Sequence, residues 1–184
     1  MAKRIITHSG TPEWQALFRS FTSTAFRLET LQHYSVPSEL AALARFLEEG
    51  QPDFTLLTNW TSMVRENAAA GRKMSRVRIV VEPPTDYTRF ELANYPLMIE
   101  AGDAIQVIAT PAGSWPADLP KEDFWLFDDH DLWILHYGDA GDFQGAELID
   151  DLDVIEQHRT WRDIAIELAI PVADYMAHAT WRAT

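Results

Sequence analysis

One group of charged and tyrosine side chains has the composition of a ligand-binding site. Arg76 and Arg78 alternate with apolar residues in the segment RVRIVV, so both project from one face of a predicted strand. Guanidinium forks, tyrosine hydroxyls and carboxylates can together bind an anion or exchange protons with a substrate. We define the candidate ligand-binding cluster by seven members: Arg27, Glu29, Arg76, Arg78, Tyr87, Arg89 and Glu91.

The same residues can instead neutralise one another in a half-buried network that fixes how a helix docks on a sheet. From Arg72 to Glu91 the chain has five basic and three acidic residues, so most of the arginines have a carboxylate nearby. Asp86 and Arg89 are three residues apart and share a helix face. The sequence favours the structural network and keeps the binding site as the alternative.

Acidic residues are concentrated in the second half of the chain. Residues 1–92 contain 11 Lys/Arg and 10 Asp/Glu, whereas residues 93–184 contain 4 and 18. Such a field repels phosphate backbones and attracts basic surfaces. It either keeps a tryptophan-rich domain in solution or steers a partner. The candidate acidic partner face comprises Asp128, Asp129, Asp131, Asp139 and Asp142.

Neither a metal site nor a known catalytic motif is predicted. The acidic turns supply the oxygen ligands that Mg²⁺ requires, but their spacing matches no calcium loop, and turns favour Asp for backbone reasons. We therefore expect no metal and no cofactor. The glycine-rich phosphate loops, H-E-x-x-H and G-x-S-x-G are absent. His136 and Glu147 can pair across predicted strands, but acid–base catalysis would also need a pocket and a third group.

Hydrophobic periodicity predicts the elements of the first half. Helical spacing of apolar residues predicts three helices, over about residues 11–21, 37–50 and 53–70. Alternation predicts strands over residues 25–35, 75–82 and 104–109. A short helix is predicted to begin after Thr85, and Pro96 is expected to limit its continuation.

The second half predicts three consecutive strands, DFWLFDD, DLWILHYG and FQGAELID, joined by short polar turns as a β-meander. A long helix follows from about residue 151, and Pro171 begins a last helix. Residues 1–10 are expected to be a flexible N-terminus. Residues 11–184 are expected to form one α+β domain, with a mainly antiparallel sheet packed by N-terminal helices and a long C-terminal helix.

Composition bounds the class of protein. The sequence has no run of 18 apolar residues, no secretory signal and no cysteine, which together fit a cytoplasmic protein. Seven tryptophans are many for this length. Trp115, in a proline-rich loop, and Trp181, near the C-terminus, lie outside any apolar stripe, so each is a candidate for an interface or for packing within the domain.

Four segments together resemble a family of domains of unknown function common in actinobacteria, the DUF6879-like family. They are FRLETLQHYSVP (26–37), AAGRKMSRVRIVVEPPTDYTRFELANYP (69–96), DFWLFDD (123–129) and HYGDAGDFQGAELIDD (136–151). The resemblance spans most of the chain and implies no catalytic residues. Its members are often encoded beside helix-turn-helix regulators, which implies a regulatory, partner-binding or toxin–antitoxin-like setting.

Two functions remain open from the sequence. The first is a non-enzymatic cytoplasmic protein whose acidic face binds a basic protein partner, such as a helix-turn-helix regulator, without contacting nucleic acid or membrane. The second is an enzyme or small-molecule-binding protein whose arginine, tyrosine and glutamate cluster acts on an anionic ligand or on RNA. The order of elements loosely resembles that of small ribonuclease toxins, but the acidic second half argues against RNA.

Overall fold

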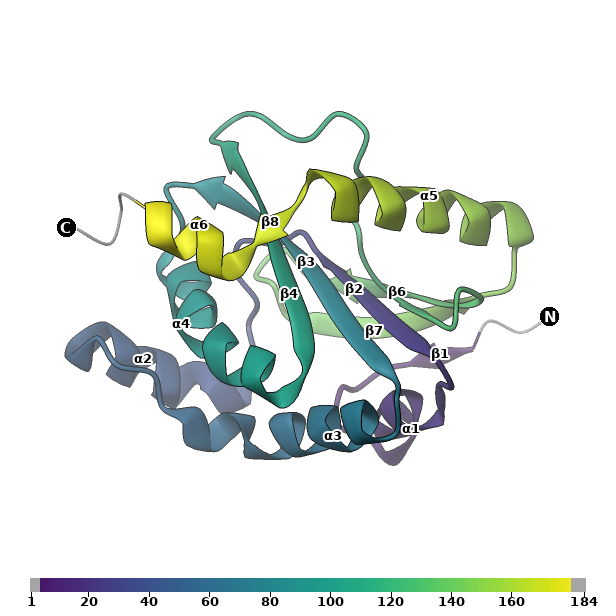
Figure 1. The fold of residues 1–184 in the computed structure, drawn as a ribbon, viewed down its shortest axis with the longest axis horizontal. Coiled ribbons are helices and arrows are strands. Elements are labelled where there is room, and N and C mark those ends of the chain that lie inside the picture. Colours follow the sequence, from purple (N-terminus) through teal and green to yellow (C-terminus); the bar gives the residue numbers. More distant parts are fainter. Residues whose placement is uncertain (1–3, 180–184) are drawn as a thin grey trace.

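The computed structural model describes residues 4–179 and arranges them around an eight-stranded sheet (Figure 1). β2 pairs in parallel with β3, and β3 with β4, whereas the other neighbours are antiparallel. The fold is therefore α+β with a mainly antiparallel sheet, as predicted. The strands lie in the order β1 (Ile5–Ile6), β7 (Phe143–Ile149), β6 (Asp131–Tyr137), β5 (Asp123–Phe127), β2 (Thr24–Glu29), β3 (Lys73–Glu82), β4 (Asp103–Pro111) and β8 (Ile170–Pro171).

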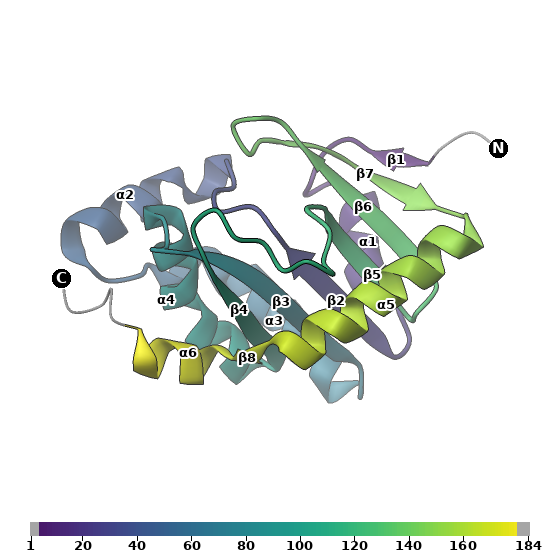
Figure 2. The same ribbon diagram turned by 90° about the horizontal axis from the view of Figure 1, so that it is seen from above.

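Helices cover both faces of this sheet (Figures 1 and 2). One face packs against α1 (Pro12–Ser20), α3 (Thr58–Ala69) and α4 (Asp86–Ala101), and α2 (Leu40–Glu49) packs on α4. The other face packs against α5 (Leu152–Leu168), and α6 (Val172–His178) lies beside β4 and α4. Short 3-10 turns, Pro37–Glu39 and Phe54–Leu57, precede α2 and α3. No helix among residues 4–179 combines the length and the apolar character needed to cross a membrane.

Side chains at the helix ends fix where the helices begin. The Thr11 hydroxyl accepts the Trp14 N–H at the start of α1, and the Thr85 hydroxyl accepts the Thr88 N–H at the start of α4. The Asp151 carboxylate caps α5 in the same way. These caps satisfy N–H groups that have no partner within the helix. They orient α1 and α4 over the sheet face that carries the arginines.

The β-meander is confirmed as the run β5, β6 and β7, joined by tight turns. The first strand of the N-terminal half is shorter than predicted, because β2 ends at Glu29 rather than near residue 35. Beyond it, the Thr30 N–H and hydroxyl both donate to the Asp123 carboxylate, at 2.8 and 2.6 Å. A side chain thus replaces the neighbouring strand as hydrogen-bond partner, and the chain leaves the sheet.

Pro96 does not end its helix, contrary to the prediction. α4 continues to Ala101 and ends at Gly102, which has a φ of 115°. Proline removes one hydrogen bond from a helix. Met98 and Ala101 are nevertheless buried in the turn beyond it, and this apolar packing favours continuation. Within the segment expected to be a flexible N-terminus, Ile5 and Ile6 form strand β1 on the outer edge of β7.

The central strand β3 is buried on both of its faces. Val77 and Ile79 join the apolar core under α5, while Arg76 and Arg78 project from the opposite face. Parallel strands covered by helices on both sides are buried in this way. The predicted alternation therefore places two arginines inside the protein, beneath α3 and α4. Trp115 packs in the loop before β5 with its indole N–H donated to Leu119, and Trp181 lies outside the described residues.

Candidate functional site: an arginine-floored cavity

A cavity of about 310 Å³ lies between the sheet and helices α1, α3 and α4. Arg27 and Glu29 of β2 and Arg76 of β3 line its floor. Ser9 and Ser38 line it too and are exposed, so they mark its opening. Eight aromatic side chains line its walls: Trp14, Phe18, Tyr34, Trp60, Tyr87, Trp125, Tyr137 and Phe143. A volume of this size is at the lower end of those typical of small-molecule sites.

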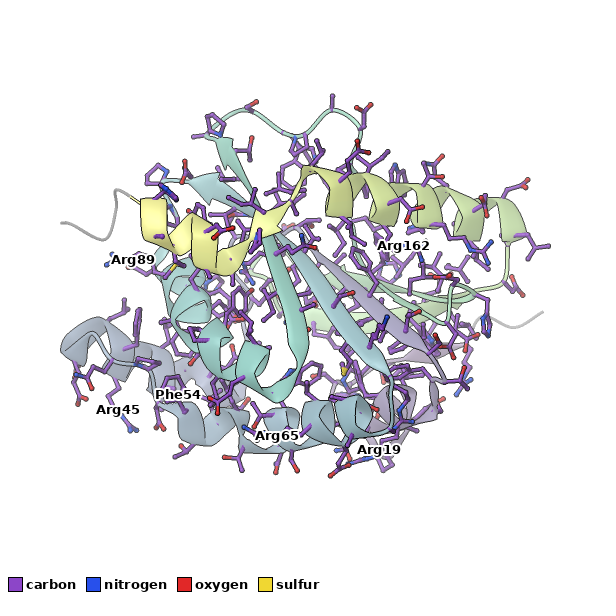
Figure 3. All side chains as sticks on the ribbon, viewed as in Figure 1. Arg19, Arg45, Phe54, Arg65, Arg89 and Arg162 are labelled. Atoms are coloured by element: carbon purple, nitrogen blue, oxygen red, sulfur yellow. The ribbon has the colours of Figure 1, made fainter. Side chains whose placement is uncertain are left out.

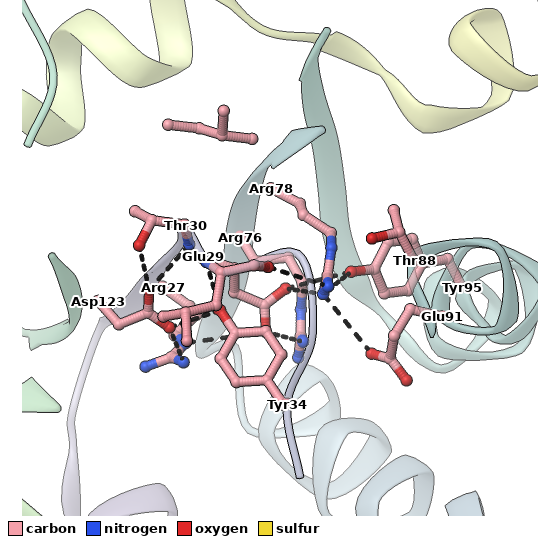
Figure 4. A network of polar contacts seen from close by, with 12 residues as sticks. Arg27, Glu29, Thr30, Tyr34, Arg76, Arg78, Thr88, Glu91, Tyr95 and Asp123 are labelled. Carbon is pink, nitrogen blue, oxygen red and sulfur yellow. Dashed lines mark hydrogen bonds and ion pairs between the residues drawn. The ribbon is translucent and has the colours of Figure 1, made fainter. Parts of the chain in front are cut away.

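The carboxylate of Glu29 is the centre of the floor (Figure 4). Arg27 pairs with Arg76 across the parallel strands, and Glu29 pairs with Arg78, so all four side chains project from one sheet face. One Glu29 oxygen lies 3.3 Å from Arg76 Nη1 and 3.8 Å from Arg27 Nε. The other lies 3.4 Å from Arg78 Nη1 and accepts the Tyr95 hydroxyl at 3.1 Å.

This arrangement determines the charge of Glu29. Burial alone would raise its pKa, but the guanidinium groups of Arg76, Arg78 and Arg27 lower the pKa to about 2. Glu29 is therefore ionised at neutral pH. The pKa of each of the three arginines is raised above its ordinary value by nearby carboxyl and tyrosine groups, although burial opposes the rise. At neutral pH, Glu29 and the three arginines are therefore all ionised.

Two aspartates hold the outer ends of the network. Asp123, at the start of β5, accepts Arg27 Nη2 and the Tyr34 hydroxyl, each at 2.6 Å. Asp103, at the start of β4, accepts Nε and Nη2 of Arg76 at 3.0 and 2.8 Å. Neither aspartate was among the site residues predicted from the sequence. Each is an acid at the first position of an apolar strand, and that pattern is the signal that could have indicated them.

Aromatic rings cover the guanidinium groups. The ring of Trp125 lies 5.8 Å from Arg27, and the ring of Trp60 lies 5.4 Å from Arg76. Tyr34 covers Arg78 at 5.3 Å. Cation–π contacts of this kind stabilise charges that have been removed from water. They also give the cavity flat apolar walls around a charged floor.

The α4 side of the cavity carries carboxyl groups that lack close basic partners. Glu91 lies 3.9 Å from Arg78, and the Tyr87 hydroxyl donates to Glu39 at 2.8 Å. Burial raises the pKa of Glu91 to about 8, a rise that Arg78 opposes and that the carboxyl group of Glu39 reinforces. Burial likewise raises the pKa of Glu39, although the Tyr87 hydrogen bond lowers it. Both carboxyl groups therefore tend to keep a proton.

Within the described part of the chain, three buried donors of the network and the cavity wall lack a hydrogen-bond partner: Arg27 Nη1, Arg78 Nε and Trp60 Nε1. Arg27 is 4% exposed and lines the cavity, and its Nη1 is buried without a hydrogen bond. The other terminal nitrogen, Nη2, is bonded to Asp123 and to the Tyr137 hydroxyl. A buried guanidinium donor left unsatisfied costs free energy. This nitrogen has almost no surface accessible to solvent, so a ligand oxygen in the cavity would satisfy it only after a small side-chain shift exposes it.

Six of the seven predicted cluster residues meet in this network, and Arg89 does not. Arg89 projects from the outer side of α4, where its side chain is 43% exposed and lies 3.7 Å from Asp86 (Figure 3). Sequence spacing placed Arg89 on a helix face but could not show which face meets the sheet. Tyr87 and Glu91 occupy the inward face.

Asp128, a member of the candidate acidic partner face, instead serves the fold. Its carboxylate accepts the N–H groups of Thr22, Ser23 and Thr24 at 2.6 to 3.0 Å, and also the Thr22 hydroxyl. These bonds lower the pKa of Asp128, although burial opposes them. The residue holds the start of β2 against the β5–β6 turn, so it is not free to meet a partner.

The remaining acids of the candidate face form two groups. Asp129 lies in the turn before β6 and Asp131 is the first residue of β6, whereas Asp139 and Asp142 lie in the turn after it. The seven residues of β6 separate these turns by roughly 20 Å. All four side chains are exposed, and Asp129 pairs with Arg162 of α5. The acids thus lie at opposite ends of the meander rather than on one patch.

A comparison with family models matches residues 12–177 to the domain of unknown function DUF6879. The chain belongs to the DUF6879 family. No curated protein matches it. The matched range of this DUF6879 domain includes every residue of the network described above. The family description carries no activity, so the chemistry must come from the side chains themselves.

No histidine within residues 4–179 of this DUF6879 protein lines the cavity, although the ring of His33 packs against that of Tyr87. His136 Nε2 lies 3.2 Å from Glu147, the pairing that the sequence suggested, but neither residue lines the cavity. His158 is buried on the other sheet face, against Phe124 and Trp161. Across residues 4–179, no three histidine or acidic side chains converge with the geometry of a metal site.

Proposed function

We propose that this DUF6879 domain binds a small molecule in the cavity between β2, β3 and the helices that cover them. The unpartnered Nη1 of Arg27 carries this proposal, because it is a buried, unsatisfied cationic donor of a residue that lines the cavity. An oxygen of the ligand, most effectively one of a carboxylate, accepts from this nitrogen. The aromatic walls hold a flat or apolar body beside it.

The other charges of the floor position Arg27 rather than bind the ligand. Asp123 and Glu29 flank its guanidinium, and Trp125 lies against it, so the side chain is held in one orientation. A donor that is already fixed and desolvated binds a ligand without a further cost of ordering. The structural-network and binding-site interpretations of the cluster are therefore compatible, because the network builds the site.

RNA fits this site less well than a small molecule does. Arg27, Arg76 and Arg78 are each no more than 6% exposed, whereas a phosphate backbone requires an exposed basic surface. We propose binding rather than catalysis. Glu29 and Glu91 have widely separated pKa values, but Glu29 is already committed to three arginines.

The proposal is tested by blocking the cavity. Ser38 is exposed at its opening, so Ser38→Trp places an indole across the entrance with little effect on folding. Ser62→Trp, an exposed position on α3 outside the cavity, is the matched control. Each protein is incubated with the small-molecule fraction of its native cell extract and separated by gel filtration. Retained compounds are released by denaturation and identified by mass spectrometry.

We expect at least one compound to be retained by the wild type and by Ser62→Trp and lost from Ser38→Trp. Arg27→Gln should weaken its retention, because the substitution removes the cationic donor. Equal retention by Ser38→Trp would move the binding site elsewhere. Retention of nothing by the wild type would overturn the proposal.

A second proposal is binding of a basic cytoplasmic protein, such as a helix-turn-helix regulator, at the end of the meander next to α5. Leu152 supports it, because this apolar side chain is 79% exposed between Asp151 and Asp153. Asp131 lies next to Leu132, which pairs with Ile149 at the end of β7. An apolar anchor surrounded by carboxylates suits a partner of opposite charge.

This second proposal is tested by affinity capture from the native lysate at low and high salt. A basic protein should be retained at low salt and released at high salt. Leu152→Ser should lose it, whereas Leu47→Ser, another exposed leucine far from the acidic turns, should retain it. Capture that depends neither on salt nor on Leu152 would refute this binding surface.

A further inference from the structure

We infer that the α4 end of the cavity binds a protonated amino group, so that the ligand is an amine with an oxygen-bearing or apolar remainder. This inference rests on the proposed small-molecule binding and specifies the chemical class of the ligand. Glu39, Glu91 and Tyr87 form the amine site.

The charge balance of the network requires a cation or protons at this end. The network contains three guanidinium groups but five carboxyl groups, and the surplus is two acids. The bases are Arg27, Arg76 and Arg78, and the acids are Glu29, Glu39, Glu91, Asp103 and Asp123. Isolated buried carboxylates are costly, so the surplus is neutralised either by protons or by a bound positive charge.

Glu39 and Glu91 are the two acids left over. Glu29, Asp103 and Asp123 each accept a guanidinium at 3.4 Å or less. Between residues 4 and 179, by contrast, no Lys or Arg nitrogen lies within 4.0 Å of Glu39, and the Arg78 nitrogen beside Glu91 is already shared with Glu29. Glu91 and Arg27 lie at opposite ends of the network in Figure 4. The cavity therefore has a donor at one end and acceptors at the other.

An ammonium group matches these acceptors. It has three N–H donors, and two carboxyl groups with the Tyr87 hydroxyl provide three acceptor positions at the cavity wall. The rings of Tyr34 and Tyr87 already lie 5.3 and 5.9 Å from Arg78, so this wall stabilises positive charge. The unpartnered Arg27 Nη1 at the other end is independent evidence that the cavity receives a ligand.

Binding of an ammonium group should release protons. Burial raises the pKa of Glu91 to about 8, so a proton neutralises this carboxyl group at about pH 7, and burial also raises the pKa of Glu39. An arriving cation favours the ionised carboxylates, so this proton leaves to the solvent. A buried acid pair with a purely structural role would release none.

The test uses three probes of similar size on the wild-type protein: phenethylamine, 2-phenylethanol and 3-phenylpropionate. Isothermal titration calorimetry at about pH 7, in two buffers of different ionisation enthalpy, gives both affinity and proton release. We expect phenethylamine to bind at least about tenfold more tightly than 2-phenylethanol, and to release protons. Glu91→Gln and Glu39→Gln should each reduce this preference while retaining affinity for the alcohol.

The outcomes separate the inference from the proposed function. If 2-phenylethanol binds as tightly as phenethylamine and Ser38→Trp blocks it, the cavity binds small molecules but the amine site is refuted; binding of 3-phenylpropionate instead reports on the Arg27 end of the cavity and supports the proposed function. If phenethylamine binds without proton release, the role of Glu39 and Glu91 is refuted. If no probe binds, and the wild type retains only amine-free compounds or none from the cell extract, the amine site is likewise refuted. Only retention of none would also overturn the proposed function.

Discussion

Glu29 and Arg78 are register partners on the adjacent parallel strands β2 and β3, and their side chains lie 3.4 Å apart inside the sheet–helix interface. Arg78 is fully buried, and the same Glu29 carboxylate also serves Arg27 and Arg76. Three buried guanidinium groups therefore share a single glutamate. Arg27 and Arg76 each have a second carboxylate, Asp123 and Asp103, whereas Glu29 is the carboxylate closest to Arg78.

Glu29→Gln should lower the free energy of unfolding by about 3–5 kcal/mol, because it leaves buried guanidinium charge without its counter-ion. Urea denaturation followed by tryptophan fluorescence measures the change. Arg45→Ala is the control, since the Arg45–Asp53 pair, in which the Arg45 side chain is 50% exposed, is expected to contribute little to stability. Similar losses for the two variants would show that the buried network has no special role in stability.

Glu91→Gln should change how stability depends on pH. The pKa of Glu91 in the folded protein is raised to about 8, above the value of about 4.3 for an unfolded chain. The folded state therefore binds the proton more tightly, so its contribution is complete below about pH 4.3 and is lost as pH rises through about 8.

Unfolding free energies of the wild type should accordingly fall between about pH 5 and about pH 8 more steeply than those of Glu91→Gln. The amide cannot ionise and needs no proton. The variant should equal or exceed the wild type in stability at about pH 8, where the buried acid has begun to ionise. Parallel pH profiles for the two proteins would contradict the raised pKa of Glu91.

Asp128→Asn should destabilise the protein by about 1–3 kcal/mol, because the carboxylate accepts three backbone N–H groups at the start of β2. Asn tolerates the φ of 50° at this position, so the change tests the charge rather than the backbone. Asp139→Asn, on the exposed turn after β6, should have little effect.

The pKa of Asp128 is lowered in the folded state, so its contribution is present above the unfolded pKa of about 3.9 and is lost as pH falls. The difference between wild type and Asp128→Asn should therefore shrink on acidification below about pH 4. Circular dichroism melts across this range measure it. A difference that stays constant would assign the effect to something other than the charge.

Gly141→Ala should destabilise the protein more than Gly113→Ala does. Both glycines have φ near 80°, but a Cβ at Gly141 would lie 2.5 Å from the His33 carbonyl, whereas nothing lies within 4 Å at Gly113. The shared backbone strain costs about 1–2 kcal/mol in each variant. The further loss at Gly141 isolates the contact that holds the Tyr34 segment against the β6–β7 turn. Equal melting temperatures for the two variants would show that the His33 carbonyl moves away from the added methyl group without loss of stability.

The sequence predicted elements with strong periodicity and missed features set by distant contacts. The meander, the long helix α5 and the alternation of Arg76 and Arg78 followed from local patterns. The end of β2 did not, because Asp123, 93 residues away, provides the hydrogen bonds that end it. Pro96 was misjudged because buried contacts beyond the proline outweigh one missing hydrogen bond.

The candidate site was predicted only in part, because its composition also depends on contacts between residues distant in sequence. Spacing grouped Tyr87 and Glu91 correctly but could not separate them from Arg89, whose position depends on how α4 docks. Asp103 and Glu39 belong to other elements than the arginines, and only the folded chain brings them together. Conversely, the Asp128 carboxylate accepts hydrogen bonds from backbone N–H groups, a structural role that its position in a polar turn did not indicate.

The charged side chains of the cavity floor also fix the register of β2 against β3. In β2, Arg27 and Glu29 alternate with Phe26 and Leu28, which belong to the apolar core beneath α5. A slip of β2 by one residue against β3 would turn both charges into that core and both apolar side chains onto the guanidinium groups. Burying the two charges in the apolar core, and placing apolar side chains against the guanidinium groups, would both cost free energy. The misaligned sheet is therefore much less stable than the native one. Two strands that are apolar on both faces would lack this discrimination.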